Sequence, residues 1–263
     1  MDITFHGVRG SIPASGSEFS KFGGHTTCIE VMTDTAQIIL DAGSGFQSVK
    51  ICNDRPVIIL LSHFHHDHIQ GLGFNQGLFS NQNEIFICSA LCSGEETYGH
   101  LQTYYSGALF PIELLSEISN LKIKTFKEVQ SIFAQTFLLN TCQLNHPGGS
   151  AAYSVETTTT KLCCLLDNEY KESQLEILSD FIDEAELAIW DGMFTDNELE
   201  KFRGWGHSSV EQGLRLLSQS KCKKLAITHH APKRTDSHLG QIKKTIKCPD
   251  AFLAYENQSF QFE

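Results

Sequence analysis

Apolar residues along the chain fall in short runs separated by polar segments, a pattern that predicts a strand-rich α/β protein. Several runs are continuously apolar, which is typical of strands buried on both faces. The runs predict strands at residues 3–5, 28–32, 37–40, 57–61, 84–88, 152–155, 161–166, 187–189, 225–228 and 252–255. The four threonines at 157–160 lie between two of these runs and predict a hairpin turn.

Three other stretches have the apolar spacing or the boundary residues of helices. They are residues 173–185, 208–218 and 237–246. The first repeats apolar residues at helical spacing, as at Leu175 and Leu178, and the last ends before Pro249. Early strands follow one another, and helices later alternate with strands, which predicts two packed sheets with helices outside them. No linker or repeat divides the chain, so we expect a single domain over residues 1–263.

Composition and charge narrow the classes of function. With 41% hydrophobic and 19% charged residues among 263, the chain has the composition of a globular protein. A net charge of -11 argues against binding extended nucleic acid, because phosphate attraction needs a basic face. No apolar run is long enough to span a bilayer, and the start does not resemble a signal peptide. The nine cysteines are irregularly spaced without a C-x-x-C pair, so we expect reduced thiols in a cytoplasmic protein with no membrane partner.

The strongest chemical signal is a histidine cluster directly after the predicted strand 57–61. His63 and His65 are two residues apart, so in an extended segment they point the same way. Asp67 and His68 follow where the chain turns. Imidazole and carboxylate together suit Zn²⁺, Mn²⁺ or Fe. His66 would point away from this set, so we expect it not to bind metal.

Further ligand-type residues follow other apolar runs. His146 precedes Pro147 and two glycines, Asp167 ends the run 161–166, and His229 and His230 end the run 225–228. Each alone is more often a structural residue. Together they supply the histidines and the carboxylate that a pair of ions would still lack, so we expect them to meet the His63 segment.

These motifs resemble those of the metallo-β-lactamase-fold hydrolases. The H-x-H-x-D-H motif matches from His63 to His68, and the later motifs match in order at His146, Asp167 and the tandem histidines. The resemblance implies an αββα sandwich of two mixed β-sheets flanked by helices, with two divalent ions, zinc above all, at one edge. It implies one metal held by His63, His65 and His146, a second held by Asp67, His68 and one tandem histidine, Asp167 as the bridge, and Asp41 orienting the ligand loop. We favour His229 because it follows the strand directly.

A later segment resembles the phosphodiesterase branch of this family, which includes ribonuclease Z and small-molecule cyclic phosphodiesterases. Gly204-Trp205-Gly206 leads into His207-Ser208-Ser209, similar to that branch's His-Ser-Thr motif, with Ser209 replacing threonine. His207 would contact substrate and act as a catalytic proton donor, and Asp67 would orient the nucleophile as well as bind metal. Arg9 either contacts the substrate phosphate or ties loops together.

The most favoured function is therefore a two-metal phosphodiesterase in which a metal-held hydroxide attacks a small cyclic nucleotide or a phosphoribosyl cyclic phosphate. One alternative is a hydrolase of a thioester, lactone or other carbonyl substrate. A second alternative is a non-hydrolytic metal-binding or redox protein. The expected partner is a small-molecule phosphodiester, and the sequence leaves both a monomer and a homodimer open.

Overall fold

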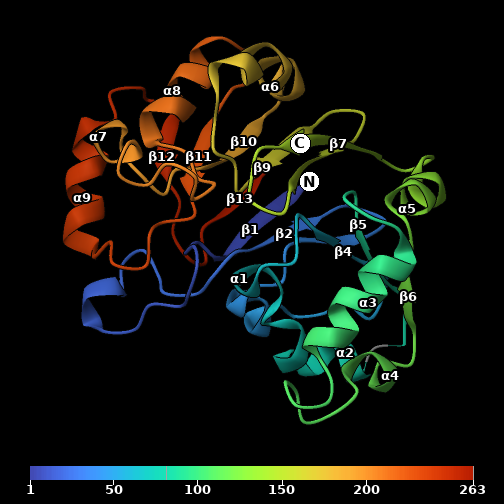
Figure 1. The fold of residues 1–263 in the computed structure, drawn as a ribbon. Helices are drawn as coiled ribbons and strands as arrows, with labels where there is room; N and C mark the ends of the chain where they lie inside the picture. Colours follow the sequence, from blue (N-terminus) through green and yellow to red (C-terminus); the bar gives the residue numbers. More distant parts are fainter. Residues whose placement is uncertain (81, 263) are drawn as a thin grey trace.

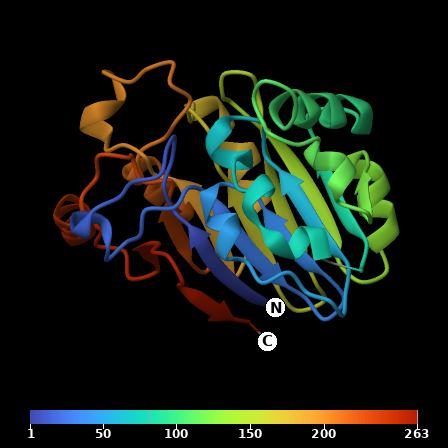
Figure 2. The same ribbon diagram turned by 90° about the horizontal axis from the view of Figure 1, so that it is seen from below.

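Two β-sheets pack face to face with helices on their outer sides in the computed structural model, which describes residues 1–80 and 82–262 (Figures 1 and 2). The seven-stranded sheet contains β1 (Asp2–Gly7), β2 (Cys28–Met32), β3 (Gln37–Leu40), β4 (Val57–Leu61), β5 (Ile85–Ser89), β6 (Leu121–Ile123) and β13 (Ser259–Gln261). The six-stranded sheet contains β7 (Leu138–Leu144), β8 (Ser150–Glu156), β9 (Lys161–Leu165), β10 (Leu187–Asp191), β11 (Leu225–Thr228) and β12 (Ala251–Leu253).

Both sheets are mixed. Their orders are β13-β1-β2-β3-β4-β5-β6 and β12-β11-β10-β9-β8-β7. In the first, β1, β2 and β3 are antiparallel neighbours, whereas β3 to β6 run parallel; in the second, β9 to β12 run parallel and β7 to β9 are antiparallel. The predicted αββα sandwich is therefore confirmed. The hairpin expected at the four threonines joins β8 to β9, where Glu156 pairs with Lys161.

The helices are α1 (His66–Ile69), α2 (Gln76–Ser80), α3 (Gly94–Tyr104), α4 (Leu114–Glu117), α5 (Phe126–Phe133), α6 (Leu175–Ile182), α7 (Asp196–Leu199), α8 (Val210–Ser218) and α9 (Asp236–Thr245). Contacts place α3 on the first sheet and α6 and α8 on the second (Figure 1). The three predicted helices are confirmed as α6, α8 and α9; both ends of α6 and α9 and the start of α8 differ from the prediction by one to three residues. No described helix is both long enough and apolar enough to cross a membrane.

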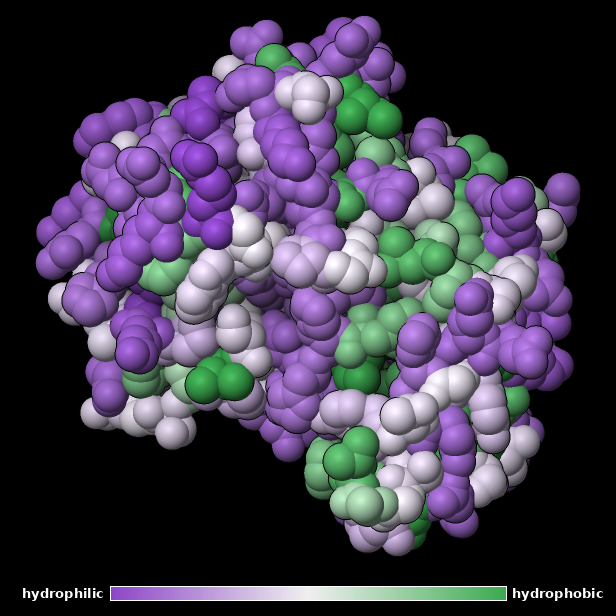
Figure 3. Space-filling model, in the orientation of Figure 1, coloured by the Kyte–Doolittle hydropathy of each residue, from purple (hydrophilic) through white to green (hydrophobic). Residues whose placement is uncertain are grey.

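The continuously apolar runs are explained by burial on both faces. In β4, Ile58 and Leu60 face the core between the sheets, while Val57, Ile59 and Leu61 face the helices outside. Side chains alternate along a strand, so each of these residues contacts one of two cores. The molecular face seen in Figure 3 is mainly hydrophilic, with hydrophobic residues in smaller patches.

Parallel strands bring their carboxyl ends to one edge of the sandwich, where loops of the two sheets meet. His230 donates its backbone N–H to Val8, and its carbonyl accepts from the N–H of Gly10. The N–H of Ala151 donates to the carbonyl of Ser62. These bonds join the segments that follow β1 and β4 to the second sheet and so position the loops that carry the histidines.

Candidate metal centre

Two sets of metal-ligand side chains meet at this edge. His63, His65, His146 and Asp167 each offer one ligand atom within 4.8 Å of the others. Asp67, His68 and His229 form a second set under the same limit. The structure thus brings together all seven residues that the sequence predicted as metal ligands, in the two groups expected.

Asp167 lies between the two sets and faces each with a different oxygen. Its Oδ2 is 3.7 Å from His63 Nε2 and 3.6 Å from His146 Nε2. Its Oδ1 is 3.1 Å from His68 Nε2 and 3.2 Å from His229 Nε2. One carboxylate with this placement can serve as a ligand in both sets.

The turn after β4 supplies four of the seven side chains. The rings of His63 and His65 lie 4.4 Å apart, as expected for two residues on the same side of an extended segment. Helix α1 begins at His66, directly after this extended segment. That start places Asp67 and His68 in the first turn, where both are buried.

Three site residues adopt left-handed backbone conformations. Asp41, Asp167 and His229 have φ of 59°, 57° and 59°, and each follows the end of a strand. Residues other than glycine rarely adopt this conformation, and it tends to be retained at functional sites. Here it ends the strand and redirects the side chain at the edge where both sheets meet.

Asp41 and Ser62 hold two of the imidazoles from behind. Asp41 Oδ2 lies 2.7 Å from His68 Nδ1 and also accepts the hydroxyl proton of Ser62 at 2.7 Å. Because that hydroxyl donates to Asp41, it accepts from His63 Nδ1, 3.0 Å away. In both rings Nδ1 is therefore engaged by these contacts, and Nε2 faces the cluster. Asp41 has the orienting contact that the sequence predicted, whereas the part played by Ser62 was missed.

The Gly-Trp-Gly segment fixes His146. Gly206 has φ of 85°, and its carbonyl accepts from His146 Nδ1 at 2.8 Å. Glu169 accepts the backbone N–H groups of Gly204 and Gly206 at 2.7 and 2.9 Å. A β-carbon at position 206 would lie 2.2 Å from His146 Nδ1, so only glycine fits there.

His207 lies beside the cluster and is held by Asp191. Its Nδ1 is 2.8 Å from Asp191 Oδ2, and its ring centroid is 5.1 Å from that of His229 and 5.4 Å from that of His146. Asp167, Asp191, His207 and His229 form a third ligand-type group, which shares Asp167 and His229 with the first two and so extends the same cluster. Ser209 caps helix α8.

Asp191 is a site residue that sequence reasoning missed. Its side chain is fully buried at the last position of β10, two residues beyond the predicted end of that strand. It also accepts the backbone N–H groups of Asn168 at 3.3 Å and Met193 at 3.1 Å. The signal available in the sequence was an aspartate directly after an apolar run, as at Asp41 and Asp167.

The cluster has the unsatisfied polar atoms that a bound cation would satisfy. Among the described residues, His63 Nε2, His68 Nε2, Asp167 Oδ1 and both ring nitrogens of His229 are buried without a hydrogen-bond partner. Leaving buried polar atoms unpaired is costly, and imidazole with carboxylate is a ligand set for divalent transition metals. The residues present therefore fit a metal centre.

Charge interactions in the metal-free cluster shift the pKa values strongly. Burial alone would raise the pKa of the Asp167 carboxyl, but the charges of His229, His68 and His63 hold it well below its ordinary value. For His229 burial acts in the opposite direction and would lower the pKa, but Asp167, then Asp191 and Asp67, raise it to about 10. The pKa of His68 is raised well above its ordinary value against the same opposing effect of burial, chiefly by Asp167 and Asp67.

His66 and His230 lie outside the ligand sets. His66 is exposed and contacts the hydroxyl of Tyr104. His230 is buried, with Nε2 2.8 Å from the carbonyl oxygen of Ala254. The structure thus separates the two tandem histidines, with His229 inside the cluster and His230 behind it.

Arg9 is buried among loops instead of facing the cluster. It donates from Nε to the carbonyl of Gly23 at 2.7 Å and from Nη1 to the carbonyl of Arg234 at 2.6 Å. Its relative exposure is 0%, so the guanidinium is closed off from solvent. Of the two roles considered for Arg9, this placement favours loop attachment over contact with the substrate phosphate.

Comparison with known proteins identifies relatives of the whole chain. Residues 37–230 match the model of a beta-lactamase superfamily domain. The chain is 22% identical over 249 residues to a "probable metallo-hydrolase", YhfI, of Bacillus subtilis, covering 94% of this chain and 93% of that protein. The YhfI crystal structure, a metallo-beta-lactamase fold protein, has a TM-score of 0.75 at 18% identity, with 98% of each chain covered.

Two further solved structures share the fold. The short form of human tRNase Z has a TM-score of 0.68 at 16% identity, with 99% of each chain covered. A diphosphatase from the PhnP family has a TM-score of 0.66 at 13% identity, covering 100% of this chain and 98% of that one. At these low identities the two comparisons show a shared fold and nothing more specific.

Proposed function

The chain belongs to the beta-lactamase superfamily and has the metallo-β-lactamase fold, and from its site we propose that it is a metal-dependent hydrolase that cleaves a small phosphodiester. His207 carries this proposal. It is a nearly buried imidazole at the edge of the cluster, held by Asp191 rather than by the two main ligand sets. Two solved structures of the same fold, named as a tRNase Z and a diphosphatase, support phosphoester chemistry.

Seven residues would hold two divalent ions, zinc being the best match to this ligand set with manganese and iron as alternatives. His63, His65 and His146 would hold one, Asp67, His68 and His229 the other, and Asp167 would bind both. When bound, such a pair lowers the pKa of water and neutralises charge on a phosphate group. These residues lie at or just after strand ends and in the short helix α1.

The chain's own groups would orient the reaction. The backbone N–H of Ser11 donates to Asp67 Oδ2 at 2.6 Å and so fixes the carboxylate that would orient the nucleophile. His207, with Nδ1 held by Asp191, would present its other nitrogen to the leaving oxygen and donate a proton. Asp191 would keep the ring in that orientation, as carboxylates beside catalytic histidines do.

The proposed substrate is small. The net charge of -11 disfavours a long polyanion, whereas a cyclic nucleotide or a phosphoribosyl cyclic phosphate needs only the local charge of the ions. We expect no membrane partner, and a cytoplasmic location remains a prediction.

A substrate screen tests the proposal. Metal-replete protein should cleave bis-p-nitrophenyl phosphate or a cyclic nucleotide and leave a lactone and nitrocefin largely intact, and metal analysis should find close to two ions per chain. Cleavage of the lactone with no phosphodiester turned over would replace this proposal with a carbonyl hydrolase. Folded protein that takes up no metal would contradict both.

A further inference from the structure

A pocket of about 520 Å³ lies beside the metal cluster. Ser11 and Met193 line it and also belong to the cluster's surroundings: the N–H of Ser11 donates to Asp67, and Met193 follows Asp191 by two residues. Phe194, which also lines it, has its ring 6.0 Å from that of His207. The pocket and the cluster are therefore neighbours, so that one ligand molecule can place one part in the pocket and its reacting part at the cluster. The volume is in the range of small-molecule sites.

Aromatic rings form much of one wall. Phe194 and Phe202 stack with centroids 4.5 Å apart and planes at 2°, and Trp205 meets Phe202 edge-on at 5.1 Å. Trp205 is 62% exposed although it is large and apolar. Its loop is fixed on both sides, because Glu169 holds Gly204 and Gly206. A rigidly held, exposed indole beside a reactive cluster is a surface that a flat ligand can cover by stacking.

Cationic groups line the same pocket. Arg234 pairs with Glu198, so these two charges offset each other. Lys233 is exposed and forms no ion pair within residues 1–80 and 82–262, which leaves a positive group at the pocket. An aliphatic acyl group would make no use of a cation, whereas a base with polar edges on an anionic backbone uses both the rings and the charge.

We propose that this pocket binds the nucleobase of a nucleotide substrate, which selects a cyclic nucleotide over a phosphoribosyl cyclic phosphate. The inference rests on the proposed phosphodiesterase function, since it takes the phosphate to lie at the metal cluster. Trp205 and Phe202 provide the stacking surface, and Lys233 provides the charge.

The two tryptophans of the chain allow a binding test that does not depend on turnover. Trp190 is fully buried, so adenosine added to the metal-replete protein should quench only the fluorescence of Trp205. The quenching should saturate for adenosine and AMP, be absent with ribose 5-phosphate, and disappear in Trp205→Phe. Absence of saturable quenching by adenosine and AMP, or saturable binding of hexanoate in their place, would overturn the nucleobase assignment.

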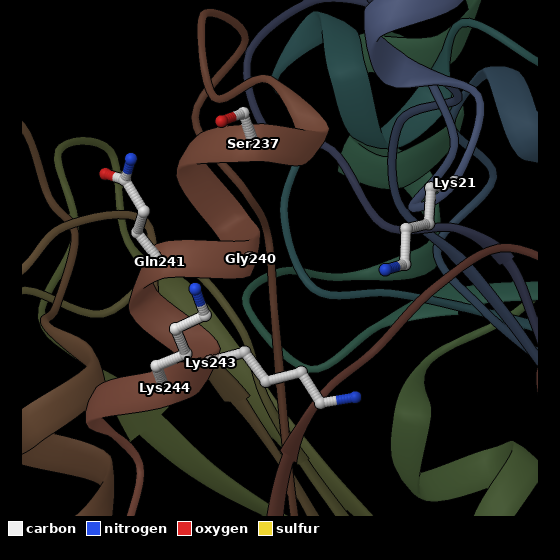
Figure 4. A pocket seen from close by; sticks show the side chains of 6 residues that line it. All are labelled: Lys21, Ser237, Gly240, Gln241, Lys243 and Lys244. Carbon is white, nitrogen blue, oxygen red and sulfur yellow. The ribbon is translucent and has the colours of Figure 1, made fainter.

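A lysine-lined hollow provides the control for nonspecific attraction of nucleotides. Lys21, Lys243 and Lys244 line this second hollow, of about 480 Å³, together with residues of helix α9 (Figure 4). The double variant Lys243→Gln/Lys244→Gln should keep the quenching by AMP. Loss of quenching in that variant would place the nucleotide at the lysines and contradict the proposal.

Turnover separates the pocket from the proposed function. With a 2′,3′-cyclic nucleotide and a cyclic ribose phosphate lacking the base, Trp205→Ala should reduce the ratio of the two kcat/KM values by about 5- to 100-fold, the usual effect of losing one stacking partner. Tyr255→Ala, which removes an aromatic residue 44% exposed outside the pocket, should leave the ratio unchanged. Cleavage of both substrates with no preference for the base would overturn the pocket assignment and leave the phosphodiesterase standing. Adenosine binding without any phosphodiester cleavage would support the pocket assignment and overturn the proposed phosphodiesterase function.

Discussion

Asp191 holds His207 through a contact of 2.8 Å between carboxylate Oδ2 and imidazole Nδ1, and both side chains are buried. The other oxygen of the same carboxylate lies 3.7 Å from His229 Nδ1. One aspartate at the end of β10 therefore touches both the proposed proton donor and a proposed metal ligand. This arrangement links the proposed proton donor to the proposed metal centre through the end of one strand.

Asp191→Asn should lower phosphodiester turnover by roughly 10- to 100-fold, because the ring of His207 loses its charged partner. If Asp191 acts through His207, the double variant Asp191→Asn/His207→Ala should be hardly slower than His207→Ala alone. Steady-state kinetics on the three variants measures this coupling. Fully additive losses would mean that Asp191 acts on something other than His207, and the exposed Asp180→Asn serves as the control.

The tandem histidines should differ in their effect on metal content. His229→Ala should empty the set formed with Asp67 and His68, so about one ion per chain should be lost. His230→Ala should keep metal content near wild type while lowering stability, since His230 contacts the carbonyl of Ala254 behind the cluster. Metal analysis with thermal melting tests both, and equal metal loss in the two variants would refute the assignment.

Gly206→Ala should disturb the metal centre from a distance in sequence. The new β-carbon would collide with His146 Nδ1 and would sit at a φ of 85°, a strain of about 1–3 kcal/mol. We expect a lower melting temperature and loss of the ion bound by His63, His65 and His146. Gly240→Ala is the matched control, because the space around Gly240 in helix α9 is open and alanine favours a helix. Similar behaviour of the two variants would show that the 206 loop does not fix His146.

Metal uptake should release protons and strengthen as pH rises. In the metal-free protein the pKa of His229 is raised to about 10 and that of His68 is also raised, which favours the cationic form of both rings. A metal binds only the neutral ring, so filling this set should displace roughly two protons. Titration calorimetry at pH 7 in buffers of different ionisation enthalpy counts them. Heat that is independent of the buffer would mean that the two rings are already neutral before the metal binds.

Much of the site was predictable because its chemistry is concentrated in short motifs at strand ends. The strand 57–61 and the histidines after it stand out in the sequence, and the structure brings the predicted ligands together. Arg9 was harder to place, because its role depends on carbonyls from distant loops. Asp191 was missed because the apolar pattern predicts a strand end at Ile189, whereas pairing of Asp191 with Thr228 extends β10.

Helices α3 and α5 were missed for a different reason. Their start signals are capping boxes, Ser93 with Glu96 and Thr125 with Glu128, and not long apolar stripes. The short strands β6 and β13 are three residues each and are stabilised by a neighbouring strand in the sheet. Strands this short depend on pairing with a neighbouring strand, which a single sequence does not display.

The central claim is that His207 acts on a phosphodiester at a metal centre that does not require it as a ligand. The most direct test is the kcat of His207→Ala on a phosphodiester that the wild type cleaves, with metal content and melting temperature measured on the same samples. We predict that both ions are retained, the melting temperature stays near wild type, and kcat falls by roughly 10²–10⁴-fold, the usual contribution of one general acid–base group. A variant that keeps its metals and also full phosphodiesterase activity would contradict the account.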